Sequence, residues 1–353
     1  MKKVVTAIIA AVIVGLMAFG YWQNVQHPAA EEELDPQALI FEHLGDAYGW
    51  ELPFSHDIKI PLPIIVKDAA GSWHVFSSSR LAEGQEYEGF KIAAEGDNKG
   101  KVVTTGSDGA ELRPLDLSVT KNVAGAFIAV ICVVAMVLSL KRWYVKNGMK
   151  APTGMTAFLE VIVDFVYMQT VRPILGKNAS KYGSYLLTVF FFILTMNLLG
   201  LAVIFPGGAN LTGNLAVTMT LAIITFLLIN FTKSKEYWKE IFWPEMPMAF
   251  KCPVPLMQLI EVLSALIKPV ALMVRLFANM IGGHMAVLVF IMLIFIFGAF
   301  GTVFSVVTTP VSLAFTLFML LLDTLVSFIQ AYVFTILSTM FISMSHPVEE
   351  EHE

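Results

Sequence analysis

The sequence predicts an all-α integral membrane protein with about five transmembrane helices, two of which form a long tilted antiparallel hairpin, preceded by a small β-rich extramembrane domain. Two observations predict this class. Of the 353 residues, 56% are hydrophobic and 14% are charged, whereas an ordinary soluble domain has about 25% charged residues. The charges also occur in blocks that separate long apolar segments. No basic patch indicates nucleic-acid binding.

The first segment, residues 1–20, is expected to be a signal peptide or a retained N-terminal anchor. It begins with two lysines, continues with an apolar run and ends with Ala18 and Gly20, a small-residue spacing that a signal peptidase accepts. The aromatic pair that follows would instead suit a retained helix at the membrane interface. Either alternative places the next domain, residues 21–120, outside the cytoplasm.

Residues 21–120 are expected to form a small domain of four to six strands. Short alternating or β-branched runs such as "IKIPLPIIV", "SWHVFSSS" and "KVVTT" are separated by turn signals such as "EGDNKG". The histidines of this region are too scattered for a metal site. We therefore expect no metal and no cofactor, and the residues do not indicate what the domain does.

The membrane domain is expected over residues 121–346. Residues 122–140 form a first span, and "KYGSYLLTVFFFILTMNLLGLAVIFP" forms a second, since each is long enough to cross the hydrocarbon. A third span is expected at about 215–231. Between the first two, residues 154–176 carry charges among aromatic residues, which is typical of an amphipathic helix lying along the membrane surface.

The distribution of basic residues predicts the orientation. The segments "KRWYVKNGMK" and "KSKEYWKE" lie on one side of the membrane, while the loops at 206–214 and 298–310 contain no lysine or arginine. Basic loops face the cytoplasm. The N-terminal domain is therefore expected outside the cytoplasm, and the C-terminus, with the acidic tail 347–353, inside it.

The last part of the membrane domain is expected to be two long helices, about 254–297 and 306–345, joined near residue 303. Four shorter spans are the alternative, but no polar loop occurs between 267 and 297 or between 311 and 345. At about 1.5 Å per residue each helix would be about 60 Å long, roughly twice the thickness of the hydrocarbon. Such helices must tilt strongly or run partly along the membrane.

The first long helix carries a stripe of polar residues. Glu261, Lys268 and Arg275 are seven residues apart, and Asn279 follows four residues later. At 100° per residue these four share one face, while His284 points to roughly the opposite side. An arginine at the bilayer centre costs at least about 2.5–3.5 kcal/mol, so it requires a partner or a water-filled cavity.

The second long helix carries Asp323 and Gln330, also seven residues apart. If the hairpin bends near residue 303, Arg275 lies level with Gln330, and His284 lies level with Asp323. Gln330 is neutral and cannot balance Arg275, so the cation is expected to face a group outside this chain. A histidine titrates near neutrality, so we favour a proton relay over simple packing for His284 and Asp323. For an isolated polar residue such as Asn197, packing is the favoured interpretation.

These motifs resemble subunit a of the rotary F-type ATP synthase, the stator part of its membrane sector. The resemblance covers about residues 120–346. It depends on "KPVALMVRLFANMIGGH", on "FIQAYVFTILSTMFISMS" near the C-terminus, and on "TMNLLGLAVIFP" and "NLTGNLAVTMTLAI" in the preceding spans. An arginine motif followed at this spacing by "QAYVF" is highly specific for the family.

The resemblance implies a function and a set of partners. In this family the hairpin lies against a ring of small subunits, the c-ring, each with one carboxylate at mid-membrane, and subunit b forms the peripheral stalk. Arg275 corresponds to the essential arginine that faces the passing carboxylate, and Gln330 lies beside it. The implied location is the bacterial inner membrane, with the N-terminal domain in the periplasm. The implied partners are the other F0F1 subunits, membrane lipid and the translocated proton.

The resemblance also assigns two aqueous half-channels. His284, Asp323 and Asn279 match polar residues of the outer half-channel, and Glu261 matches a residue of the cytoplasmic one. Lys268 belongs to the "KP" pair of the family, where a snorkelling or packing role is favoured. Many bacterial relatives have an acid at the position of His284 and a histidine at that of Asp323, so the pair is exchanged here. Which of the two takes the proton first stays open.

Three alternatives remain open at this point. A sodium-coupled form of the same subunit would share these residues, because the ion site belongs mostly to the rotor. A secondary transporter would show internal repeats, and we find none. A scaffold without transport would need no arginine. The sequence lacks a GxxxxGK[ST] phosphate loop, so the chain is expected to be a non-catalytic subunit, with ATP chemistry on its partners.

Overall fold

The computed structural model describes residues 45–345, except 53–54, 69–70, 95, 97, 106–110, 149, 202–209, 233–255 and 300–301. The predicted leader at 1–20 and the acidic tail at 347–353 therefore lie outside the described residues. The chain divides into two compact units. The first contains the described residues up to Ala124, and the second begins at Gly125.

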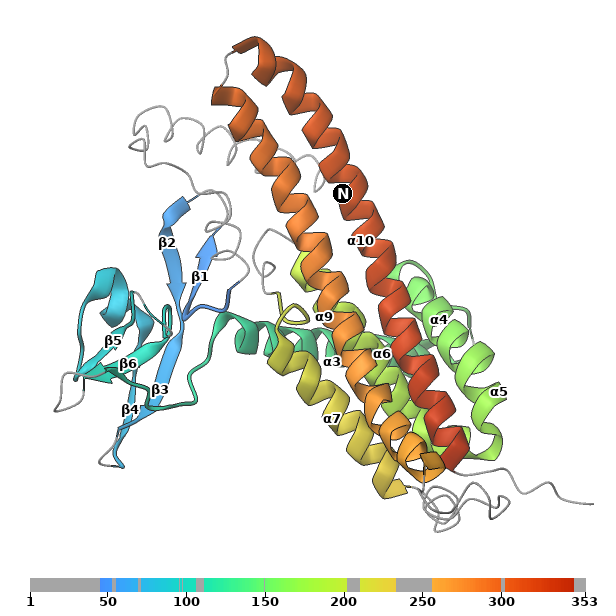
Figure 1. Ribbon diagram of the computed structural model, residues 1–353. Helices are drawn as coiled ribbons and strands as arrows, with labels where there is room; N and C mark the ends of the chain where they lie inside the picture. Colours follow the sequence, from blue (N-terminus) through green and yellow to red (C-terminus); the bar gives the residue numbers. More distant parts are fainter. Residues whose placement is uncertain are drawn as a thin grey trace, which may run out of the picture. The chain divides into compact units, whose positions relative to one another are not determined.

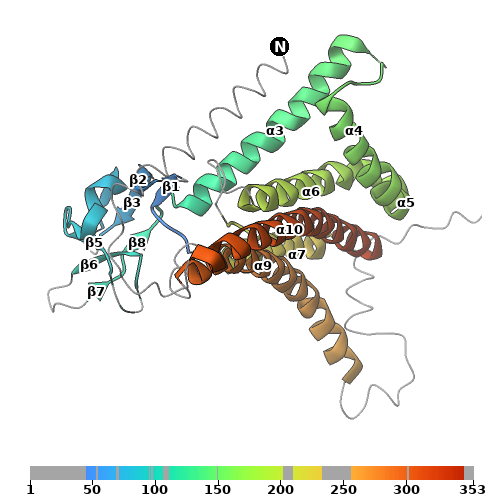
Figure 2. The same cartoon turned by 90° about the horizontal axis from the view of Figure 1, so that it is seen from above.

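The first unit is built from short strands, as the alternating sequence predicts. Its eight described strands form three small antiparallel sheets, in the orders β1-β2, β4-β3-β8 and β5-β6-β7. Figure 2 labels these strands except β4, which Figure 1 labels. Their bounds are β1 Gly49–Leu52, β2 Ser55–Pro61, β3 Pro63–Lys67, β4 Trp73–Ser77, β5 Phe90–Ile92, β6 Val102–Thr105, β7 Glu111–Leu112 and β8 Leu115–Asp116. A 3₁₀ helix, η1, covers Ser78–Gly84.

The prediction of four to six strands was too low, for a physical reason. The strands β7 and β8 are two residues long each, which is too short for an alternating pattern to appear in the sequence. The predicted runs themselves are confirmed as β2, β3, β4 and β6. One buried apolar cluster joins the three-stranded sheets through Ile64, Val66, Phe76, Phe90 and Val102.

The second unit is helical (Figure 1). After α3 Lys121–Asn147 come α4 Met155–Val166, a π-helical turn η2 Tyr167–Val171, α5 Arg172–Leu175, a 3₁₀ turn η3 Gly176–Asn178, α6 Ala179–Leu201 and α7 Leu215–Thr232. These helices confirm the predicted segments, although α3 extends seven residues beyond the predicted end at 140. The orientation of 154–176 along a membrane surface stays a prediction.

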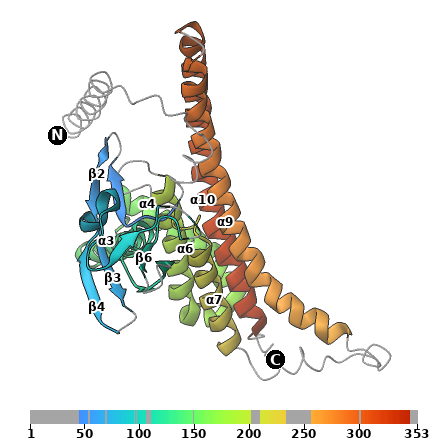
Figure 3. The ribbon, with the colours of Figure 1, turned by 60° about the vertical axis from the view of Figure 1, so that its left-hand side comes forward.

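The two long helices are confirmed. The helix α9 covers Leu256–Ala299 and α10 covers Thr302–Ser345, 44 residues each. They lie side by side as an antiparallel hairpin, and Figure 3 shows the N-terminal part of α9 diverging from α10. Pro269 lies inside α9, where a proline removes a backbone hydrogen bond and bends the helix. The tilt of the hairpin in a bilayer stays a prediction.

Four stretches of the described chain are long and apolar enough to cross a membrane. They are Lys121–Asn147, Met155–Leu201, Pro269–Ile294 and Val306–Ser343, and Leu215–Leu227 is a shorter apolar helix. The sequence predicted about five spans. Four are found among the described residues, and α7, the predicted third span, is shorter than these four. The result is a mostly helical multi-pass membrane protein.

The core of the second unit lies where α6 packs on α10. Phe190 and Ile193 of α6 and Ala331 and Phe334 of α10 are buried in one apolar cluster. A Cβ atom at Gly183 would lie 2.4 Å from the ring of Tyr167, so this glycine is what allows the π-helical turn to approach α6 closely. The α6–α10 interface fixes one face of α10 and thereby the position of the hairpin.

Candidate functional site between the long helices

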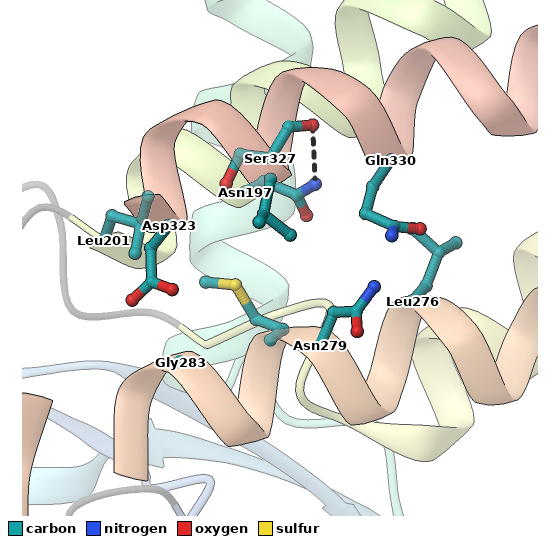
Figure 4. Close-up of a pocket in the computed structure, with 10 residues that line it drawn as sticks. Asn197, Leu201, Leu276, Asn279, Gly283, Asp323, Ser327 and Gln330 are labelled. Atoms are coloured by element: carbon teal, nitrogen blue, oxygen red, sulfur yellow. Dashed lines mark hydrogen bonds between the residues drawn. The ribbon is translucent and has the colours of Figure 1, made fainter. Parts of the chain in front are cut away.

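Polar side chains of the hairpin meet in one small pocket that α6 closes (Figure 4). The space in this pocket that the centre of a water molecule can occupy is about 10 Å³, which is room for about one water molecule. Its lining comes from three helices and comprises Asn197, Leu201, Leu276, Asn279, Met280, Gly283, Asp323, Val326, Ser327 and Gln330. Three residues that the sequence singled out, Asn279, Asp323 and Gln330, are therefore brought together.

The depth pairing expected from the bend near residue 303 is confirmed by a direct contact. A Cβ atom placed on Gly283 would lie 2.5 Å from Oδ1 of Asp323. Gly283 of α9 thus lies level with Asp323 of α10. Seven residues away along each helix, Leu276 and Gln330 line the same pocket. The hairpin is in the register that the spacing of the polar residues predicts.

Arg275 lies at the expected depth but does not line the pocket. Its side chain is exposed on α9, on a face where Ala271, Ala278 and Gly282 are also exposed. No ion pair or hydrogen bond joins its guanidinium to any residue that the structure describes. Gln330 is buried in the pocket. The two side chains are therefore level in depth and differ in the surface that they face.

Asn279 connects these two surfaces. It follows Arg275 by one helical turn and has an exposed side chain, and it also lines the pocket beside Gln330 (Figure 4). The stripe predicted from the sequence therefore runs from the open face of α9 into the pocket between the helices.

Asp323 is the acidic group of the pocket. Its Oδ2 atom is buried and has no hydrogen-bond partner among the described residues. His284 is partly buried and follows Gly283, but it is not among the residues that line the pocket. The expected pairing of His284 with Asp323 thus holds in depth, while the direct neighbour of the carboxylate is Gly283. A relay between the two side chains stays a prediction.

Sequence reasoning assigned Asn197 only a packing role, and the structure shows what this residue holds together. Its Nδ2 donates to the carbonyl oxygen of Ser327 at 3.4 Å, and the hydroxyl of Thr212 donates to its Oδ1 at 2.8 Å. Asn197 is buried and also lines the pocket. A polar residue in the middle of the apolar run "LTMNLLG" was the available signal.

The remaining predicted residues belong to the first turns of α9. Glu261 and Lys268 lie in the helix, but their side chains lie outside the described part of the structure, so their expected roles stay predictions. Among the described residues no group of three or more His, Cys, Asp or Glu side chains is arranged to hold a metal ion.

The helices and this pocket define a class: a multi-pass helical membrane protein in which a long hairpin carries polar groups within its apolar length. A comparison with models of known protein families identifies the family. Residues 125–343 match the family model described as ATP synthase A chain, so the chain belongs to this family. Residues 39–118 match a second model, described as a domain of unknown function (DUF8433).

Curated relatives agree with this assignment. The chain is 37% identical to ATP synthase subunit a of Chloroherpeton thalassium over 69% of its own length and 70% of the relative. It is 36% identical to ATP synthase subunit a 2 of Chlorobaculum tepidum, over 69% of this chain and 67% of that one. It is 38% identical to ATP synthase subunit a of Myxococcus xanthus, over 68% and 76% of the two chains.

Proposed function

We propose that the hairpin forms two proton half-channels that meet at Arg275, where this arginine faces the carboxylates of a rotating c-ring. The family is that of the proton-channel subunit of the F0 sector, a non-catalytic membrane subunit. The observation that carries the finer proposal is the position of Arg275. It is exposed within an apolar surface of α9, and the described part of this chain offers it no counter-ion.

The energetics of a charge in the membrane support an external partner. A guanidinium within the hydrocarbon costs at least about 2.5–3.5 kcal/mol unless an opposite charge or water receives it. An opposite charge in turn favours the ionised form of a carboxylate. A rotor carboxylate that reaches Arg275 must therefore release its proton on one side and take up another after passing, which prevents protons from leaking without rotation.

The pocket residues fit the outer half-channel. Asn279, Gln330 and Asp323 form a polar line from the open face of α9 towards the pocket, and we assign His284 to the same path from its depth. Glu261 is assigned to the cytoplasmic half-channel, and Lys268 to its vicinity. Proton movement through this path would supply about 2.3 kcal/mol per charge for each 100 mV, which ring rotation would transmit to the catalytic subunits.

The remaining assignments follow the same proposal. The partners are the c-ring, subunit b of the peripheral stalk and the other F0F1 subunits, in the inner membrane of a bacterium. The basic segments on one side support a cytoplasmic C-terminus and a periplasmic first unit. The proposed coupling ion is the proton, because the family is that of the proton-channel subunit, and Asp323 and His284 are groups able to bind and release it.

The direct test is Arg275→Ala in the assembled complex. Proton-driven ATP synthesis is expected to fall below detection, while the amount of assembled complex stays unchanged, because the side chain is exposed and makes no ion pair or hydrogen bond with a described residue. Arg172→Ala is the matched control, since Arg172 is an exposed arginine of α5 whose described side-chain contact is with Sδ of Met168. Retained synthesis in Arg275→Ala would contradict the proposal, as would an equal loss in the control.

A further inference from the structure

The sheet β4-β3-β8 of the first unit has an apolar face on each side. One side is buried, with Ile64, Val66 and Phe76 in the core. The other side is open. The members of this outer apolar face are exposed or partly exposed, and they are Ile65, Lys67, Trp73, Val75, Leu115 and Leu117.

The strand register makes these six side chains one contiguous surface. Val75 lies opposite Ile65, and Trp73 and Leu115 both lie opposite Lys67. The N–H of Leu117 donates to the carbonyl of Ile65 at 2.9 Å, which continues the same register. Residues that face each other across antiparallel strands point to the same side, so the two rows of side chains are adjacent.

Such exposed apolar side chains are unusual on a sheet face that contacts water. Trp73, Val75, Leu115 and Leu117 are 52%, 68%, 58% and 59% exposed. Antiparallel sheets with one buried face normally present polar residues on the other. A contiguous exposed apolar surface instead marks a site of contact with a protein or a membrane.

Hydrogen bonds hold this face next to the start of the membrane helix α3. The N–H of Val119 donates to the carbonyl of Pro63 at 3.0 Å, and that of Lys121 donates to the carbonyl of Ala47 at 2.8 Å. The N–H of Asn122 donates to Oδ1 of Asp46 at 3.2 Å. Leu117 is four residues from Lys121, a distance of at most about 14 Å along an extended chain. The outer apolar face therefore begins close to the membrane surface.

The composition of the face fits a lipid surface. The ammonium of Lys67 lies 5.6 Å from the ring centre of Trp73. Tryptophan is enriched at membrane interfaces, where its ring is apolar and its N–H is hydrated. Lysine is attracted to anionic headgroups. Aliphatic side chains around this pair would enter the boundary between headgroups and acyl chains.

We propose that the outer apolar face docks on the lipid bilayer, with Trp73 and the aliphatic side chains at the interface and Lys67 near lipid phosphates. This gives the first unit, which matches a domain of unknown function, a role as a membrane-surface anchor at the start of α3. The inference depends on the membrane class of the chain and is independent of the role proposed for Arg275.

Fluorescence quenching in the full chain tests this inference. Cys132 and Cys252 are replaced by serine, Val75→Cys is labelled with a small environment-sensitive fluorophore, and the chain is reconstituted in phosphatidylcholine vesicles containing phosphatidylglycerol. Lys99→Cys is the matched control, because Lys99 is exposed in the turn between β5 and β6 and lies outside the face. A second label at Leu117→Cys guards against local unfolding at either position.

Opposite quenching patterns are expected at the two sites. A lipid-borne quencher should act several-fold more strongly at 75 and 117 than at 99, and aqueous iodide should show the reverse. Equal iodide access at 75 and 99 would overturn the proposal, because the face would then lie in water. Protection from iodide without quenching by the lipid-borne group would also overturn it and would assign the face to a protein contact.

Discussion

The first unit and the helical hairpin differ in how their charged side chains are balanced. In the first unit, Nδ1 of His74 lies 2.6 Å from Oε2 of Glu88, and Lys91 pairs with Glu111 at 2.9 Å. In the hairpin, neither Arg275 nor Asp323 makes an ion pair with a described residue. The charges of the hairpin lie in a far more apolar setting, where an unbalanced charge is costly.

This difference separates two uses of polar residues in one chain. Charges that are paired within the chain hold its own strands together. Charges that the described part of the chain leaves unbalanced in an apolar setting favour a partner outside it, which for Arg275 is the proposed carboxylate of the rotor. Substitution of polar groups with partners inside the helical unit, such as Asn197 with Thr212, should then change stability. Substitution of Arg275, or of Gly283 in contact with Asp323, should change transport.

After Arg275, the largest effect is expected at the contact between Gly283 and Asp323. In Gly283→Ala the new methyl group would overlap the Asp323 carboxylate, which lies within 2.7 Å of that position. Overpacking of this kind costs about 1–3 kcal/mol, and a displaced proton-carrying group is expected to lower the rate of proton-driven ATP synthesis about tenfold or more. The rate is measured in inverted membrane vesicles with the amount of assembled complex as reference.

The neighbouring glycine provides the control. A Cβ at Gly282 meets nothing within 4 Å, and alanine stabilises a helix by up to about 1 kcal/mol relative to glycine. Gly282→Ala should therefore leave Asp323 in place and keep the normal amount of assembled complex. Synthesis is not the readout for this variant, because Gly282 lies seven residues after Arg275 and thus on the face proposed to meet the ring. Normal synthesis in Gly283→Ala would show that the position of Asp323 has no special importance for transport, and the comparison between the two regions would fail.

A smaller effect, confined to stability, is expected at Thr212. Thr212→Val keeps the shape of the side chain and removes its hydrogen bond to Oδ1 of Asn197, which is buried. Thr212 lies in the turn before α7, and a buried hydrogen bond of this kind contributes about 1 kcal/mol, so the free energy of unfolding in a detergent titration should fall by about that amount. Synthesis per assembled complex should not change.

Thr220→Val serves as the reference for Thr212→Val. The hydroxyl of Thr220 donates to the carbonyl of Ala216 within its own helix at 2.8 Å, so its removal breaks no contact between helices. A loss of transport in Thr212→Val at normal stability would show that polar groups of α6 belong to the proton path.

The smallest effect is expected from pH in the first unit. The hydrogen bond that His74 donates to the Glu88 carboxylate raises the pKa of His74 above its ordinary value of 6.5, and the same contact lowers the pKa of Glu88 below 4.5. The contribution of His74 to stability is then fully present below pH 6.5 and is lost as the pH rises through its raised pKa. That of Glu88 is present above pH 4.5 and is lost as the pH falls through its lowered pKa.

Limited proteolysis of the first unit in the full chain measures this pH dependence. Cleavage should become faster as the pH is raised above neutrality, and His74→Gln should remove most of that change. Asp68, 3.5 Å from Nε2 of His74, acts in the same direction, so Asp68→Asn should weaken the dependence partly. An unchanged profile in His74→Gln would show that the pairing does not stabilise the folded unit.

The sequence predicts the hairpin far better than it predicts the details of the site. Both long helices and their register follow from an uninterrupted apolar pattern and from polar residues at fixed spacing, because these features are local. The contact of Gly283 with Asp323 depends on which faces of two helices meet, and a glycine carries no signal for that. The π-helical turn at Tyr167–Val171 and the two-residue strands β7 and β8 arise from tertiary packing and leave no periodicity in the chain.

The outward direction of Arg275 is the central claim, and cross-linking at Ala278, one turn away on the same face of α9, tests it most directly. Ala278 is exposed, whereas Ser327 of α10, at about the same depth, is buried. In a background with Cys132 and Cys252 replaced by serine, Ala278→Cys should form a disulfide with a cysteine placed beside the rotor carboxylate, and Ser327→Cys should not. An assembled complex in which position 278 stays unlinked would contradict the account.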